Sequence, residues 1–96
     1  MLHLYLVCYD ICDEKRVKSV FKTMKGFGDH LQFSVFRCEL TEMNLVRMKM
    51  ALDEIIKVKE DQVLIFRLGP MDGTYTEQVE ALGLPYEPAE HGALIV

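Results

Sequence analysis

The chain has 96 residues, of which 50% are hydrophobic and 27% charged, a composition typical of one folded globular domain and not of a disordered or fibrous chain. No apolar run approaches the roughly 20 residues that span a bilayer. The apolar start has no basic region before it and no cleavage site after it, so we expect a cytoplasmic protein. The three cysteines, Cys8, Cys12 and Cys38, lack zinc-site spacing, which indicates reduced thiols.

Charge is divided unevenly along the chain, whose formal net charge is −4. Residues 1–67 hold all 11 Lys and Arg against 10 Asp and Glu, whereas residues 68–96 hold 5 acids and no base. The acidity belongs to the C-terminal part, so the rest of the chain can accept a nucleic-acid partner. A chain this short has a thin core that a second copy would help to cover, and we therefore expect a homodimer.

Two elements are predicted in the first third of the chain. Residues 2–9 are apolar on both sides, the pattern of a central strand whose two faces are both covered. Asp13 is a suitable N-cap for a helix that ends before Gly26. Apolar residues recur at helical spacing along this helix, at Val17, Val20, Phe21 and Met24.

Three more elements are predicted before residue 69. Residues 31–40 have strand character and form either one strand or two kinked ones. Thr41 can cap a second helix that ends near Lys59. Its apolar stripe consists of Leu45, Met48, Leu52, Ile55 and Ile56. Residues 63–68 form a further buried strand, which Gly69 and Pro70 stop.

The signals weaken after Pro70. Residues 75–82 suit a short edge strand or a helical turn, and we expect the edge strand. Residues 93–96 end the chain on four apolar side chains, so another part of the structure should cover them. The order of elements predicts one α+β domain over residues 1–96, a ferredoxin-like fold with two helices on one face of an antiparallel sheet. Its core comprises residues 1–68, followed by the edge strand and tail over 69–96.

Asp10 is the first candidate for chemistry. It directly follows the buried first strand, so its carboxylate emerges at a sheet end beside the start of the first helix, where hard cations and anions are commonly bound. An Asp in this position can equally serve only to turn the chain or to cap the helix. Position alone leaves both interpretations open.

The first helix concentrates positive charge. Its bases are Lys15, Arg16, Lys18, Lys22 and Lys25, against only Asp13 and Glu14. Such a face suits contact with phosphates, although an ordinary solvated helix surface has the same composition.

Polar residues within the predicted strands are further candidates. Arg37 and Arg67 must reach an edge, a rim or a partner, and they can line a groove. Ser34 and Phe36 share one side of their strand and can support a site. Alternatively, Phe36 is a core ring and Ser34 a small filler at a kink. The three histidines, His3, His30 and His91, suggest no common geometry.

Several segments, taken in chain order, resemble one family. They are Tyr9-Asp10-Ile11, Asp13-Glu14-Lys15-Arg16, Gln32-Phe33-Ser34-Val35-Phe36, Leu40-Thr41-Glu42 and Asp61-Gln62-Val63-Leu64-Ile65-Phe66-Arg67-Leu68. They cover roughly residues 2–68, and their order is more specific than any one of them. The chain resembles the CRISPR-associated endoribonucleases, the smaller protein of the CRISPR spacer-acquisition pair.

The resemblance implies a ferredoxin-like homodimer in which two copies of Asp10 face each other and share magnesium. Asp10 would be both catalytic residue and metal ligand, in cleavage of phosphodiester bonds of single-stranded RNA or of double-stranded DNA. Nucleic acid would lie on Lys15, Arg16, Lys18, Lys22 and Arg37, with Tyr9, Ser34 and Phe36 supporting the site.

The resemblance also implies a place in antiviral defence, as the DNA-binding bridge between two dimers of the larger integrase subunit. The final strand would add to the partner subunit's sheet, which makes Ala93, Leu94, Ile95 and Val96 a dimer contact.

Two alternatives stay open. The first is a non-catalytic scaffold of the integrase that binds DNA and has no nuclease activity of its own. The second, from fold analogy alone, is a small-molecule regulatory or phosphatase-like domain. Residues 32–37 are slightly similar to the acylphosphatase signature, but they lie within a later strand and no glycine-rich phosphate loop accompanies them.

Overall fold

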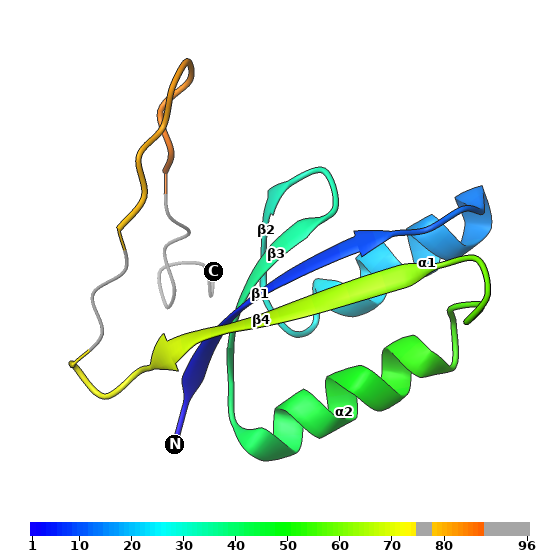
Figure 1. Cartoon of the computed structure of the whole chain (residues 1–96), viewed down its shortest axis with the longest axis horizontal. Helices are drawn as coiled ribbons and strands as arrows, with labels where there is room; N and C mark the ends of the chain where they lie inside the picture. Colours follow the sequence, from blue (N-terminus) through cyan, green and yellow to red (C-terminus); the bar gives the residue numbers. More distant parts are fainter. Residues whose placement is uncertain (75–77, 88–96) are drawn as a thin grey trace, which may run out of the picture.

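The strands and helices follow one another in the order that the sequence predicts. The structure is a computed structural model and describes residues 1–74 and 78–87. Its elements are β1 (His3–Asp10), α1 (Glu14–Met24), β2 (Asp29–Gln32), β3 (Val35–Leu40), α2 (Glu42–Asp53) and β4 (Gln62–Pro70). The four strands form one sheet in the order β2-β3-β1-β4, and every neighbouring pair is antiparallel (Figure 1). This is the ferredoxin-like α+β arrangement, so the predicted fold class is confirmed.

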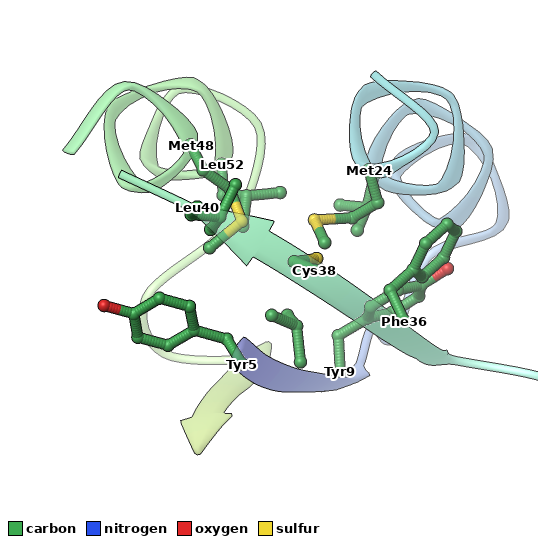
Figure 2. Packing of buried hydrophobic residues seen from close by; sticks show 10 residues of the cluster. Tyr5, Tyr9, Met24, Phe36, Cys38, Leu40, Met48 and Leu52 are labelled. Carbon is green, nitrogen blue, oxygen red and sulfur yellow. The ribbon is translucent and has the colours of Figure 1, made fainter. Parts of the chain in front are cut away.

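The core lies between the sheet and the two helices. Both helices cover the same face of the sheet, and their buried side chains meet those of β1 and β3 (Figure 2). Every second residue of β1 points to this face, because side chains alternate along a strand. The buried cluster consists of Tyr5, Val7, Tyr9, Val20, Met24, Phe36, Cys38, Leu40, Met48 and Leu52.

The helices begin at the predicted caps, but α2 ends earlier than expected. The Asp13 carboxylate accepts the Arg16 N–H at 3.0 Å, and the Thr41 hydroxyl accepts the Asn44 N–H at 3.1 Å. The prediction that α2 reaches Lys59 is wrong, because residues 54–60 leave the helix in tight turns. The N–H groups of Ile55 and Ile56 both bond to the Leu52 carbonyl at 3.0 Å. Both side chains still pack against the core, so the predicted stripe is confirmed.

Two strand predictions are refined by the structure. Residues 31–40 belong to two strands, β2 and β3, joined by a turn at Phe33 and Ser34. Gly69 and Pro70 do not stop β4, because β4 is an edge strand and an edge position tolerates a proline that donates no hydrogen bond. Nor is β4 buried on both faces, since Leu64 and Phe66 are 43% and 47% exposed.

The segment after β4 leaves the sheet. Gly73 has a φ of 91°, and the Asp72 side chain accepts the Thr74 N–H at 2.9 Å, so the chain turns there. Residues 78–87 contain no helix or strand and form a loop beyond the end of β4 (Figure 1), so the edge strand expected over 75–82 is wrong for its described part. Residues 75–77, and the dimer contact expected at 93–96, lie outside the described residues. Within the described ranges, no helix is long and apolar enough to cross a membrane.

Candidate active site

Asp10 is the last residue of the central strand β1 and is exposed. It lies opposite Gln62 at the start of β4. Its neighbour Tyr9 is 7% exposed and points into the core, so alternation places Asp10 on the sheet face that the two helices leave uncovered. The chain therefore presents the Asp10 carboxylate at the end of its central strand, on the sheet face that the helices leave uncovered.

Asp61 anchors the loop that follows Asp10. Its carboxylate accepts the Cys12 N–H at 2.9 Å and the Lys57 N–H at 2.8 Å. The Arg16 guanidinium completes the set, with Nε 2.8 Å from Oδ2 and Nη2 3.1 Å from Oδ1 of Asp61. The Asp61 side chain is fully buried. One carboxylate thus ties the residues after β1 to α1 and to the turn before β4.

The charges of this ion pair stabilise each other. Hydrogen bonding to Arg16 is the largest cause that holds the pKa of the Asp61 carboxyl well below its usual range, and the bonds from Cys12 and Lys57 add to it. The same pairing raises the pKa of Arg16. A second acid, Glu60, lies 3.1 Å from Arg16 Nη2. The sequence predicts Arg16 on nucleic acid, whereas in the structure these contacts engage its guanidinium, and 15% of its side chain is exposed.

The contacts of Asp61 could not be predicted from the sequence. No local pattern marks it, because its partners Arg16 and Cys12 lie 45 and 49 residues away in the chain. The sequence contains one indication of this ion pair: Asp61 stands just before a predicted strand, and Arg16 lies in the first turn of a predicted helix.

The remaining predicted bases of α1 lie in the open. Lys15, Lys18 and Lys22 are exposed, as is Lys25 just after the helix. The Lys25 ammonium lies 5.5 Å from the centre of the Phe21 ring, a cation–π distance. These lysines form a basic surface along α1. The buried residues Val20 and Met24 of the same helix face the core and do not belong to this surface.

The two strand arginines are held by neighbours. Arg37 Nη1 lies 2.6 Å from Glu39 Oε2, and 14% of the Arg37 side chain is exposed. It lines a hollow with Lys25, Gly28 and Asp29. Arg67 Nη2 lies 2.8 Å from His3 Nε2, at the opposite end of β1 from Asp10. Arg37 is therefore the strand arginine nearer to the basic surface of α1.

The predicted supporting residues divide between core and turn. The Tyr9 and Phe36 rings stack with centroids 6.3 Å apart, and burial raises the pKa of the Tyr9 hydroxyl. The Tyr9 N–H donates to the Ser34 carbonyl at 3.1 Å. Phe36 is fully buried, so the alternative assignment of Phe36 to the core and of Ser34 to a bend in the chain describes the structure. These residues fix the strand end that carries Asp10.

The cysteines of the described residues form no disulfide. Cys38 is fully buried, and desolvation raises the pKa of its thiol to about 12. The Cys12 thiol donates to the Glu60 carbonyl oxygen at 2.9 Å. Among the described residues, no group of three or more His, Cys, Asp or Glu side chains could hold a metal ion. One chain thus contributes a single carboxylate, that of Asp10, to the candidate site.

Comparison with known proteins identifies the family. A family model described as "CRISPR associated protein Cas2" matches residues 1–73. A protein of Geobacter sulfurreducens named CRISPR-associated endoribonuclease Cas2 is 43% identical over 96 residues, all of both chains. One of the same family name from Rhodospirillum rubrum is 43% identical over 94 residues, 98% of this chain and 91% of the relative.

Solved structures agree with the sequence relatives. A crystal structure titled cas2 superposes with a TM-score of 0.75 at 29% identity, over 94% of this chain and 97% of its own. Cas2 from Streptococcus pyogenes superposes with a TM-score of 0.71 at 34% identity, over 83% and 99% of the two chains. On the family match over residues 1–73, the 43% identity to a relative over the full chain and the superposition on a solved structure of the same name, the chain belongs to the Cas2 family of CRISPR-associated proteins.

Proposed function

We propose that this chain is a magnesium-dependent endonuclease of CRISPR spacer acquisition that cleaves single-stranded RNA as a homodimer with Asp10 at its centre. The observation that supports it best is the exposed Asp10 carboxylate at the end of the central strand, on the uncovered sheet face. The family's relatives carry the name endoribonuclease. Double-stranded DNA is a second proposed substrate.

The uncovered sheet face supports a second copy as partner. Leu64 and Phe66 project from β4 and lie across from Cys8 and Leu6 of β1, and both are more than 40% exposed. A groove of about 650 Å³ lies on this face. Leu6 and Val35 line it on the sheet side, and residues between 79 and 87 line it on the other side. Burying such apolar area against an identical face would stabilise a small domain. The same contact would bring two copies of Asp10 toward each other.

The fit of magnesium depends on this second copy. Magnesium keeps several of its waters and accepts few protein carboxylates, so one Asp from each chain is a suitable donor set. Bound there, the metal would supply an activated water and neutralise charge on the phosphodiester. Three groups of the chain would contribute to cleavage. Asp10 would hold the metal, Asp61 would keep the loop after Asp10 in place, and the lysines of α1 would bind phosphates.

The direct test is cleavage of labelled RNA and duplex DNA, with and without magnesium, by the unaltered protein and Asp10→Asn. We expect Asp10→Asn to lose metal-dependent cleavage by roughly 100-fold or more, since the amide is a poor magnesium ligand. The matched control is Glu42→Gln, which alters an exposed carboxylate in the first turn of α2 and should cleave normally. Equal cleavage by Asp10→Asn and the unaltered protein would refute the proposal.

A scaffold role is the second candidate, favoured by the exposed lysines of α1. In that role the dimer would bind DNA and bridge two dimers of the larger integrase subunit, without cutting. No cleavage by the unaltered protein, together with DNA binding that weakens steeply with salt, would favour the scaffold over the nuclease.

A further inference from the structure

The turn between β2 and β3 holds the one positive φ among the non-glycine residues that the structure describes. Phe33 has a φ of 33°, in the left-handed region that disfavours bulky side chains. Its ring is also 93% exposed. The chain therefore accepts backbone strain and an exposed aromatic ring at the same residue, without gaining any core packing from it. Such outliers cluster at binding and catalytic sites.

The turn is held firmly from both sides. The Tyr9 N–H donates to the Ser34 carbonyl at 3.1 Å, and His30 Nε2 lies 2.7 Å from the Phe33 carbonyl oxygen. The His30 ring itself packs against Phe21 and Phe36, with centroid distances of 4.9 and 5.1 Å. The Phe33 ring is thus presented from a backbone that is fixed to the aromatic part of the core.

The position of the turn relates Phe33 to the proposed cleavage site. Cys8 pairs with Val35 and Tyr9 bonds to Ser34, so the antiparallel register brings Phe33 to the same end of β1 as Asp10. Figure 1 shows the β2–β3 turn and the end of β1 on the same side of the sheet. On the other side of His30, the Lys25 ammonium lies over the Phe21 ring. The turn that carries the exposed Phe33 ring thus lies at the Asp10 end of β1, and His30, which contacts that turn, packs against the Phe21 ring beside Lys25.

We propose that Phe33 is a base-stacking contact, on which an unpaired base of single-stranded RNA lies as its backbone follows the lysines of α1 toward Asp10. An aromatic face beside a basic surface is the usual combination in proteins that bind single strands. Bases in a duplex are already stacked on each other, so the contact selects for single strands. This inference rests on the proposed function, because it assumes that RNA reaches Asp10.

The test compares Phe33 variants by fluorescence anisotropy on labelled oligouridine, in magnesium-free buffer so that RNA is not cut. Loss of one stacked base should weaken binding by Phe33→Ala and Phe33→Gly by roughly 5- to 100-fold, whereas Phe33→Trp should bind at least as well. An oligomer with the same phosphates but no bases should bind all variants equally. Phe33→Gly should also raise the melting temperature, since glycine adopts a positive φ without strain. Stability and binding would then change in opposite directions, which damage to the fold cannot produce.

The control is Met43→Ala, which removes another exposed apolar side chain, 63% exposed and located at the start of α2; it should bind RNA normally. If Phe33→Ala bound oligouridine as tightly as the unaltered protein, the stacking inference would be wrong but the proposed function would stand. A second contradicting result is that Phe33→Ala sediments as a monomer while its remaining dimers bind RNA as tightly as those of the unaltered protein. The ring would then belong to a contact between copies of the chain. Absence of RNA binding by the unaltered protein would overturn the proposed function as well.

Discussion

At the scale of single residues, the Asp61 carboxylate ties the loop after Asp10 to α1 and to the turn before β4. It accepts two backbone N–H groups and both arms of the Arg16 fork. A buried carboxylate with this many donors stays ionised and is costly to replace, because its neighbours would be left without partners. The loop after Asp10 therefore depends on a residue far from it in sequence.

The pH dependence of stability should reveal this anchor. The folded-state pKa of Asp61 lies well below its usual range, whereas in the unfolded chain it is near 3.9. Its contribution to folding is therefore present above about pH 4 and is lost as the pH falls further toward the folded-state pKa. We expect Asp61→Asn to lower the melting temperature by several degrees at pH 7, and the difference from the unaltered protein to shrink below about pH 4.

The control for this measurement is Asp53→Asn, which changes an exposed carboxylate at the end of α2. It should melt close to the unaltered protein at every pH, because exposed charges contribute little. A difference between Asp61→Asn and the unaltered protein that stays constant from pH 7 to pH 2 would contradict the role of the charged pair.

At the scale of elements, the approach of the α1–β2 connection to β3 limits what residue 28 can be. A Cβ at Gly28 would lie 2.5 Å from the Arg37 carbonyl oxygen and closer still to the Cys38 sulfur. The neighbouring Gly26 is less confined, since its Cβ would lie 3.3 Å from the Thr23 carbonyl oxygen. The same loop thus offers a tight position and a roomier one.

Alanine at these two positions should separate tight packing from general loss of glycine. We expect Gly28→Ala to lower the free energy of unfolding by about 1–3 kcal/mol, the usual cost of overpacking, with a much smaller change in Gly26→Ala. Urea denaturation of both variants measures this. Equal losses of unfolding free energy in the two variants would show that the contact of residue 28 with β3 is not the cause of the destabilisation.

The sequence predicts elements whose causes are local and misses those whose causes are not. The caps Asp13 and Thr41 and the apolar stripe of α2 follow from residues close together in the chain, and the structure confirms them. The early end of α2 is different, because the turn over 54–60 is fixed by Asp61, whose main partner Arg16 is on another helix. For the same reason the exposed position of Asp10 was predictable, whereas its Asp61 anchor and the conformation of Phe33 were not.

At the scale of the whole molecule, the two faces of the sheet differ in kind. One face is covered by both helices (Figure 2). The other presents Leu64 and Phe66 together with the Asp10 end of β1. The proposed function assigns the second face to another copy of the chain, because an isolated chain contributes one carboxylate to the site. The active unit would then be the dimer, with each copy supplying one of the two protein carboxylates that hold the metal.

Mixed dimers test this central claim most directly. Unaltered and Asp10→Asn chains would be denatured together, refolded at varied ratios and assayed for magnesium-dependent cleavage of RNA, with total protein held constant. If both copies of Asp10 hold one metal, a dimer with a single Asn is inactive, and activity should follow the square of the unaltered fraction. Activity that falls in simple proportion to that fraction would mean that each chain cleaves independently, and would contradict the shared site.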